Sequence, residues 1–314
     1  MNESLPHAAP WHRGEVALQE SVGIAGRMAE LGPKVIRDHL IAQHREFFPL
    51  LPFVVIGAVD QAGHPWATLR AGPPGFLHAP DPFHLRVEAG REGDDPAEAG
   101  LEDGEGVALL GIELATRRRN RLNGTLRREG PDGFTVRVAQ SFGNCPKYIR
   151  VRQEASAAAM VASRPPPVVS DRLDDVARAR IAAADTFFVA TFIEEAGSRQ
   201  VDVSHRGGPA GFVRIGEDGS LAIPDYSGNR FFNTLGNVMA NSRAGLVFPD
   251  FSTGDLLQMT GRAEIVLDPA RFGDIAGAER LWLFHPERVV LRAQALPLRF
   301  APADLQPDFR PHRI

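Results

Sequence analysis

Short apolar segments separated by turn residues dominate the pattern of hydrophobic and polar positions in this chain. The segment Phe53–Ile56 is apolar and rich in β-branched residues, which favours a buried strand. Asp60–Gly63 then supplies a turn, and His64–Leu69 is predicted to return as the second strand of a hairpin. The same reasoning predicts strands at Val107–Ile112, Arg121–Arg127 and Phe134–Gln140.

Helical spacing is confined to a few segments. Residues Pro33–Arg45 have a proline suited to a first helical position and apolar residues at helical intervals, so a helix is expected there. Ser170 or Asp171 is expected to cap a short helix. Its inward face would carry Leu173, Val176, Ile181 and Ala184. Two further helices are predicted, at Phe232–Asn241 and Ala270–Ala276.

The second half of the chain repeats the plan of the first. Four short segments recur in the same order, which a chance likeness between strand–turn–strand pieces explains less well than a duplication. Many short strands with few helices predict closed or nearly closed β-barrels. The pairs are Phe53–Ala58 with Phe187–Phe192, Ala71–Phe76 with Gly207–Phe212, Gly111–Leu114 with Gly245–Phe248, and Arg121–Gly124 with Gln258–Gly261.

The proline-rich stretch Ser163–Pro167 is predicted to be a stiff linker between two domains. We therefore expect an N-terminal helical extension over 1–49, a first, degenerate barrel over 50–162, a linker over 163–170 and a second barrel over 171–314. Residues Glu88–Gly106 are acidic and glycine-rich without periodicity, which predicts a solvated loop; docking of a partner is the alternative.

Composition narrows the functional classes. The chain has 314 residues, a formal net charge of −4 and one cysteine, Cys145, so an intramolecular disulfide and a multi-cysteine metal site are excluded. The charge does not indicate a general nucleic-acid binder, and no metal site is predicted. Without an apolar run of the ~20 residues that span a bilayer, or a signal peptide, the expected location is the cytoplasm.

Candidate ligand-binding residues concentrate in the second half. Ser204, His205, Arg206 and Gly207 place a hydroxyl, an imidazole and a guanidinium beside glycine, where backbone can approach an anion closely. Arginine suits a phosphate because its planar fork donates two hydrogen bonds. An ordinary polar turn at a strand end is the alternative for this segment alone.

A second group follows a predicted strand and precedes a predicted helix. It contains Asp225, Gly228, Asn229 and Arg230, and the free N–H groups at the start of helix Phe232–Asn241 would face whatever Arg230 faces. The residues alone leave a phosphate clamp and a structural loop about equally favoured.

With these residues in place, the chain resembles the pyridoxamine 5′-phosphate oxidase superfamily, whose members are FMN-binding split barrels. The resemblance extends over roughly Phe47 to Ile265. Within the superfamily, the chain is similar to an uncharacterised branch with tandem barrels. The resemblance implies that Gly228, Asn229 and Arg230 hold the FMN phosphate and that Gln258 touches the flavin ring. The segments that carry it are Ser141–Ile149, Asp202–Gly207, Gly211–Arg214, Pro224–Arg230, Gly245–Pro249 and Leu257–Glu264.

Departures from the oxidase argue against pyridoxamine phosphate as the substrate. Phe231 stands where the oxidase has a lysine after the phosphate-binding arginine, and the end, Arg310–Arg313, is not the vitamin-binding element. If the tandem barrels build internally what a dimer of the family builds, Asn144 and Lys147 would reach the flavin or its phosphate. A solvated surface lysine is the equal alternative for Lys147.

The resulting hypothesis is an FMN-dependent oxidoreductase acting on an unknown small substrate, with NAD(P)H as a candidate electron donor and a homodimer as a candidate assembly. Since the flavin supplies the hydride chemistry, no catalytic residue is assigned. The alternatives are a non-catalytic flavin sensor and a deazaflavin- or haem-binding protein on the same fold. The run Arg117–Arg121 is interpreted as a solvated hairpin tip, with a dinucleotide phosphate site as the alternative.

Overall fold

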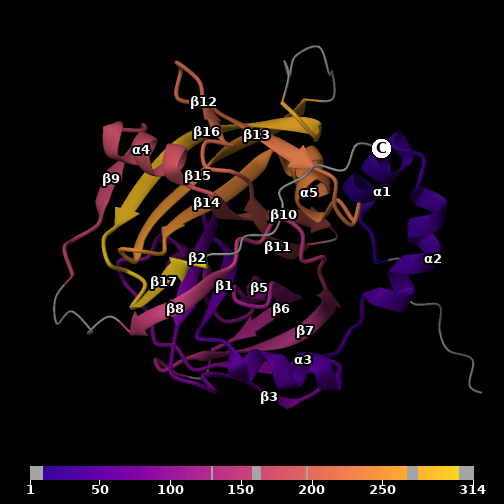
Figure 1. Cartoon of the computed structure of the whole chain (residues 1–314). Helices are drawn as coiled ribbons and strands as arrows, with labels where there is room; N and C mark the ends of the chain where they lie inside the picture. The colour runs from indigo at the N-terminus through magenta and orange to yellow at the C-terminus, as the bar shows by residue number, and fades with distance from the viewer. Residues whose placement is uncertain (1–9, 129, 158–163, 196, 267–274, 304–314) are drawn as a thin grey trace, which may run out of the picture.

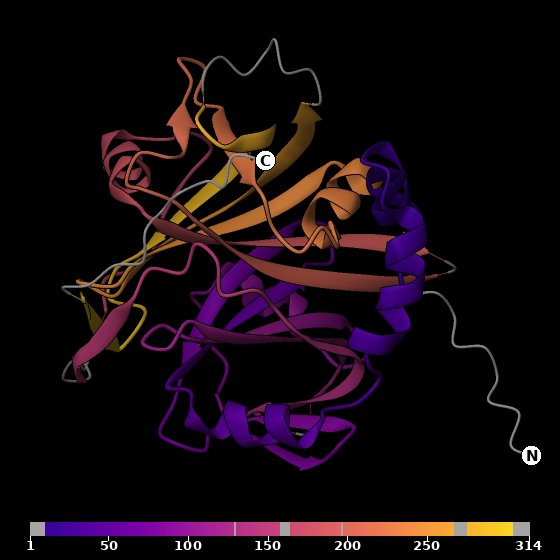
Figure 2. The same ribbon diagram turned by 45° about the vertical axis from the view of Figure 1, so that its right-hand side comes forward.

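The computed structural model describes residues 10–128, 130–157, 164–195, 197–266 and 275–303. Its described part is mainly β, as predicted, and consists of two barrels that are stacked in both views of the ribbon (Figure 1 and Figure 2). The predicted helix Ala270–Ala276 lies largely outside the described residues. None of the described helices is long and apolar enough to cross a membrane.

The first barrel is a seven-stranded antiparallel sheet with the order β2-β1-β5-β6-β7-β4-β3. The hairpin predicted at Asp60–Gly63 is confirmed, because β1 and β2 pair from Phe53 opposite Ala71 to Val59 opposite Pro65. The strands are β1 Phe53–Val59, β2 Pro65–Ala71, β3 Leu77–Asp81, β4 His84–Val87, β5 Gly106–Glu113, β6 Arg118–Arg127 and β7 Phe134–Gly143.

The second barrel has the order β11-β10-β14-β15-β16-β13-β12. Adding nine to each strand number of the first barrel reproduces this order, so the two halves share one topology. A short extra strand, β9 Val168–Ser170, pairs with β16. The main strands are β10 Thr186–Glu195, β11 Ser198–Gly207, β12 Arg214–Ile215, β13 Leu221–Tyr226, β14 Arg243–Asp250, β15 Asp255–Val266 and β16 Ala278–Arg292.

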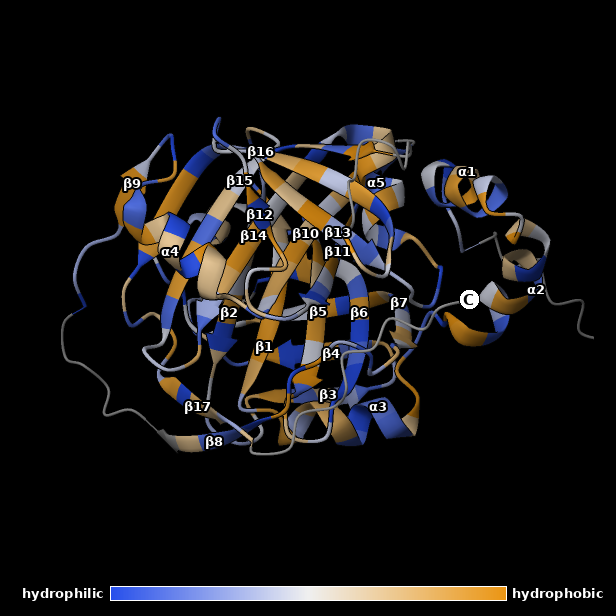
Figure 3. Cartoon of the chain, turned by 45° about the horizontal axis from the view of Figure 1, so that its top comes forward, coloured by the Kyte–Doolittle hydropathy of each residue, from blue (hydrophilic) through white to orange (hydrophobic). Residues whose placement is uncertain are grey.

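The two barrels pack against each other through β1 and its counterpart β10, which explains why both strands are almost continuously apolar (Figure 3). Side chains alternate between the two faces of a strand. Val54 and Ile56 therefore fill the first barrel, whereas Phe53 and Val55 enter a core shared with the second. At Gly57 a Cβ would lie 3.0 Å from the Cβ of Val203, so glycine permits the close approach of the sheets.

The N-terminal extension is helical but differs from the prediction. Helices α1 (Arg13–Ser21) and α2 (Ala25–Val35) precede α3 (Ala42–Phe47), and η1 (Phe48–Leu50) follows it. The predicted helix at Pro33–Arg45 is wrong, because Pro33 lies in the last turn of α2. The backbone of Arg37 then leaves the helix and forms a bridge with Ser141 of β7.

The segment after the proline-rich stretch forms α4 (Asp175–Ala183), capped by Asp174 rather than by Ser170 or Asp171. Ile181 is buried as expected, but Val176 is half exposed and Ala177 takes the inward position. Strand β17 (Leu298–Pro302), near the end of the described chain, pairs with β8 (Arg152–Ala157). This pairing ties the two halves of the chain together beyond the barrel contact.

The acidic segment Glu88–Gly106 is not a solvated loop. It contains the short helix η2 (Pro96–Gly100), and both Asp95 and Glu98 are buried. Both carboxylates pair with Arg70 of β2, so burial of the charge is compensated. Composition alone predicted solvent exposure because the partners are far away in the sequence.

Candidate functional site

A cavity open to solvent lies where the second barrel meets the first, with a volume of about 880 Å³ when its mouth is included. We call it the open cavity. Nine of the ten residues predicted to bind a cofactor line it: Lys147, Ser204, His205, Arg206, Gly207, Asp225, Gly228, Asn229 and Arg230. Asn144 and Cys145 of the first barrel also line it. Arg206 and Arg230 therefore face one cleft.

Strand β11 presents Ser204 and Arg206 on one of its faces, as strand alternation requires. Nη1 of Arg206 donates to Oδ1 of Asp225 on β13 at 2.6 Å, and Nη1 of Arg280 donates to the other oxygen at 2.8 Å. Asp225 thus neutralises part of the charge of two arginines. At Gly207 a Cβ would lie 2.1 Å from the carbonyl oxygen of Tyr148, so this contact between the halves requires glycine.

The first barrel contributes two arginines from β6, Arg119 and Arg121. The guanidinium of Arg121 donates to Oδ1 of Asp202 at 2.5 Å and to Oγ of Ser204 at 2.6 Å. It also donates to Oδ1 of Asn233 at 3.1 Å. These bonds hold Arg121 across the junction between the barrels.

The loop after β13 has an unusual backbone. Arg230 and Phe232 have φ values of 60° and 63°, in the left-handed region that non-glycine residues seldom adopt. Such conformations cost on the order of 1–3 kcal/mol each and gather at ligand sites. Helix α5 (Asn233–Asn241) begins directly after Phe232, and its first residues line the cavity.

Positive charge is in excess in the open cavity. Its lining contains two carboxylates, Asp225 and Glu279, against six cations: Arg119, Arg121, Lys147, Arg206, Arg230 and Arg280. Arg230 is 36% exposed and lies 3.5 Å from Glu279. Within the described chain no carboxylate forms an ion pair with Arg119, and its buried Nε has no hydrogen-bond partner. An external anion would satisfy this surplus.

Burial, together with the neighbouring charge of Arg121, lowers the pKa of Arg119 to about 9. The side chain stays a cation at neutral pH. Burial is also the main cause that holds the pKa of His205 well below its ordinary value, with Arg119 and Arg152 adding to it. His205 is therefore a neutral imidazole, and neither ring nitrogen has a hydrogen-bond partner among the described residues.

Gln258, the tenth predicted residue, does not line the open cavity. It is fully buried, and its Nε2 donates to the carbonyl of Ala67 and to Oδ1 of Asp95, both at 3.0 Å. Its prediction as a flavin-ring contact is thus at odds with its position, because β15 faces the first barrel there. Gln258 belongs to what we call the closed cluster: Thr68, Arg70, Glu92, Asp94, Asp95, Glu98, Gln258 and Arg292.

Several cavity residues were not singled out as site residues from the sequence. Arg119 and Arg121 were interpreted as part of a solvated hairpin tip, yet only the start of that run lies at the tip. Alternation along a strand could have separated them, since Arg119 and Arg121 share a face whereas Arg118 points away and covers the ring of Phe47. Tyr148, Phe232, Asn233, Thr234, Glu279 and Arg280 carried no comparable signal.

Comparison with known families supports the fold assignment. The family model described as pyridoxamine 5′-phosphate oxidase matches residues 173–296, which span most of the second barrel. The matched region and the barrel topology define a split barrel. Residues 173–296 thus match this family, and together with the barrel topology the match supports a pyridoxamine 5′-phosphate oxidase-like split-barrel assignment.

The solved structures to which the chain is similar are distant in sequence. HupZ of Group A Streptococcus is 19% identical, with 42% of this chain and 98% of that chain covered and a TM-score of 0.30. HutZ of Vibrio cholerae, described as a haem storage protein, is 15% identical, with 39% and 95% covered and a TM-score of 0.27. A putative pyridoxamine 5′-phosphate oxidase of Lactobacillus delbrueckii is 20% identical, with 34% and 95% covered and a TM-score of 0.26. No curated protein matches the chain.

Proposed function

We propose that the open cavity binds FMN and that the protein is an FMN-dependent oxidoreductase acting on a small substrate other than pyridoxamine phosphate. The observation that carries the proposal is the surplus of cations in one cavity built by both barrels, with Arg206 and Arg230 facing the same space. A phosphate monoester suits such a site because guanidinium groups donate paired hydrogen bonds to its oxygens.

The donors available in the cavity fit a phosphate. The Nε atoms of Arg119, Arg121 and Arg206 are buried and without partners in the described structure. Asp225 and Glu279 pair with Arg206, Arg230 and Arg280. Arg119 and Lys147 have no ion pair among the described residues, so a dianion would balance the remaining positive charge. In this proposal Arg119, Arg206 and Arg230 hold the phosphate, with Gly228 and Asn229 at its rim.

Aromatic side chains offer walls for a flat ring. Phe212 and Phe232 line the cavity from the second barrel, and Tyr148 lines it from the first. The rings of Tyr148 and Tyr226 lie 5.4 Å apart, and the hydroxyl of Tyr148 donates to the carbonyl of Ser227 at 2.8 Å. Aromatic surfaces of this kind are typical of cofactor pockets.

A bound flavin would supply hydride transfer. The residues of the chain would anchor and orient it, and the neutral His205 would keep further positive charge away from the ring. NAD(P)H is the proposed electron donor. Because the barrels already pair within one chain, a homodimer is not needed to complete the cavity.

The test is the flavin content of the purified protein and of two arginine variants. The account predicts flavin absorption near ~450 nm that is lost in Arg230→Ala and kept in Arg262→Ala, an exposed arginine paired with Glu287. Unchanged flavin content in Arg230→Ala would contradict the site. Steady oxidation of NADH or NADPH in air by the flavin-loaded protein would separate an enzyme from a flavin sensor.

One observation favours a second candidate, a haem-binding protein. A buried, neutral imidazole with both ring nitrogens free is the group that serves as an axial haem ligand, and His205 is such a group. This candidate predicts a strong band near ~400 nm that shifts in His205→Ala. A flavin spectrum that persists in His205→Ala would rule it out.

A further inference from the structure

The two barrels place the same strand positions around the open cavity and around the closed cluster. The loops that follow Arg70 and Arg206 make the same close contact, in which a glycine lies against a phenylalanine. A Cβ at Gly72 would lie 2.4 Å from Cγ of Phe76, and a Cβ at Gly208 would lie 2.4 Å from Cγ of Phe212. Arg70 and Arg206 each stand two residues before these glycines and are therefore equivalent.

A shared β-bulge fixes the positions contributed by the opposite barrel. The register shifts at Asn123/Gly124 in β6 and at Thr260/Gly261 in β15. Since Arg121 and Gln258 both lie three residues before the bulge glycine, they are equivalent. Each contacts the second strand of the other barrel: Arg121 donates to Ser204 of β11, and Gln258 donates to the backbone carbonyl of Ala67 in β2.

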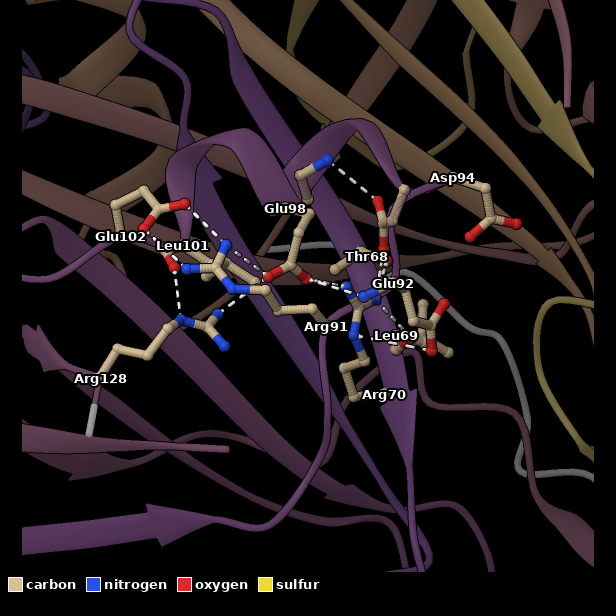
Figure 4. Close-up of polar contacts among 12 residues, drawn as sticks. Thr68, Leu69, Arg70, Arg91, Glu92, Asp94, Glu98, Leu101, Glu102 and Arg128 are labelled. Atoms are coloured by element: carbon tan, nitrogen blue, oxygen red, sulfur yellow. Dashed lines mark hydrogen bonds and ion pairs between the residues drawn. The ribbon is translucent and has the colours of Figure 1, made fainter. Parts of the chain in front are cut away.

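The closed cluster differs in what faces its arginine. Nη1 of Arg70 pairs with Asp95, and its Nη2 lies 3.0 Å from Oε2 of Glu98. Nη1 of Arg292, which comes from the second barrel, lies 3.0 Å from Oδ2 of Asp95. Figure 4 shows the carboxylates of Glu92 and Glu98 close to Arg70, with that of Asp94 standing apart. Acidic side chains of the chain itself thus surround the guanidinium groups.

Burial distinguishes the two arginines. The side chain of Arg70 is 2% exposed, whereas that of Arg206 is 21% exposed. Burial opposes ionisation of Asp95, but the charges of Arg70 and Arg292 outweigh it and hold its pKa below the ordinary value. Asp95 is therefore an anion under all ordinary conditions.

We propose that the closed cluster is a second oxyanion site, related to the open cavity by the repeat, whose ligand is the chain's own segment from Glu92 to Glu98. The carboxylates of Asp95 and Glu98 lie beside Arg70, where our proposal for the open cavity places a phosphate beside Arg206. Loss of these carboxylates would remove the buried partners of Arg70 and Arg292 and leave them the partly exposed Glu92 and Asp94, so that an external phosphate has room and donors beside Arg70. The inference goes beyond the proposed function, since it concerns the closed cluster and not the open cavity.

The test uses the double variant Asp95→Ser/Glu98→Ala, which removes both charges, makes room and keeps a hydroxyl to cap η2. It is made in an Arg119→Gln/Arg230→Ala background, so that phosphate binding in the open cavity does not contribute to the measured Tm. The probe is inorganic phosphate, compared with sodium chloride at equal ionic strength. We expect phosphate to raise the Tm of the double variant by about 3 °C or more beyond that of its parent.

A matched control is Glu102→Gln/Asp103→Asn in the same background, because both carboxylates lie at the exposed end of the same segment. Phosphate should leave its Tm unchanged relative to the parent. Adding Arg70→Gln to the double variant should abolish the phosphate effect. Equal phosphate shifts in the double variant and the control would overturn the proposal.

If the double variant does not fold in chloride, the single variant Glu98→Ala and the yield of refolding with and without phosphate provide the readout. Rescue by phosphate supports the proposal, and absence of any phosphate effect in folded Glu98→Ala and on refolding overturns it. Because the open cavity is disabled throughout, the result does not depend on whether that cavity binds FMN.

Discussion

The open cavity and the closed cluster are built from equivalent positions and yet are balanced in opposite ways. In the closed cluster the carboxylates of one loop meet Arg70 and Arg292, and the site is sealed. In the open cavity six cations face two carboxylates, and Arg119 has no acidic partner among the described residues. One duplicated framework thus yields one site that is complete within the chain and one that calls for an external anion.

The largest effect is expected on stability in the closed cluster. Asp95→Ala removes the most deeply buried carboxylate that Arg70 and Arg292 share and should lower the free energy of unfolding by about 3–5 kcal/mol, although Glu92, Asp94 and Glu98 remain beside them. Urea unfolding of the variant measures this loss. Asp103→Ala, whose exposed carboxylate lies 3.3 Å from Arg127, should change stability by less than about 1 kcal/mol. Similar losses in both variants would remove the contrast.

A second contrast is between two buried carboxyl groups: the pKa of Asp95 is lowered, whereas that of Glu15 is raised. Burial raises the pKa of Glu15 in α1 to about 8, beside Asn233 at the rear of the open cavity. The folded state then binds a proton that the unfolded chain releases near the ordinary value of 4.5. Stability should therefore fall as pH rises from about 4.5 to 8, by about 2–4 kcal/mol.

Glu15→Gln removes this titration while keeping an amide oxygen as an acceptor. The measurement is unfolding free energy against pH for the wild type and the variant, and their difference should grow toward pH 8. Parallel curves would show that Glu15 ionises in the folded protein. The comparison also cancels the opposing effect of His12 and His44, whose pKa values burial lowers to about 4.

Arg119 and Arg118 give a matched pair for ligand binding. They are neighbours on β6 with opposite faces, and Arg118 covers Phe47 instead of lining the cavity. A lost charge-assisted hydrogen bond costs about 1.5–3 kcal/mol. Arg119→Gln should therefore weaken FMN binding by about ten- to hundredfold, whereas Arg118→Gln should leave it nearly unchanged. Equal affinities in a fluorescence titration would exclude Arg119 from the site.

The smallest effect is expected at the equivalent hydroxyls Ser204 and Thr68. Ser204 accepts from Arg121 at 2.6 Å, and Thr68 donates to Asp95 at 2.5 Å. Ser204→Ala removes one acceptor of the Arg121 guanidinium, which keeps Asp202 and Asn233 as partners, and should therefore weaken FMN binding by only about fivefold. Thr68→Ala should leave the FMN affinity unchanged. A larger effect from Thr68→Ala would place the ligand in the first barrel.

The sequence predicted local strands better than contacts between distant segments. Nearly continuous apolar runs located β1, β5 and β10, because both faces of these strands are buried. The match of Gln258–Gly261 with Arg121–Gly124 agrees with the shared bulge, but Gly245 pairs at the position of Ala108, not of Gly111. Short apolar strands align at several offsets, and only hydrogen-bond register distinguishes them.

The candidate site was predictable where its residues followed one another and not where the barrels meet. Residues from Ser204 to Arg230 form two compact motifs, and the structure gathers them. The placement of Gln258 and the burial of Asp95 depend on strands brought together from opposite ends of the chain. Arg119 was hidden within a basic run because charge alone does not tell which side of a strand is covered.

The most direct test of the account is the stoichiometry of FMN binding to the full-length, flavin-free chain by isothermal titration. The account predicts one FMN per chain, binding that disappears in Arg119→Gln/Arg230→Ala and persists in Arg262→Ala. Two FMN molecules per chain would mean that the closed cluster also takes an external ligand, which would contradict the account. No binding, or binding that survives the double substitution, would contradict the open cavity as the flavin site.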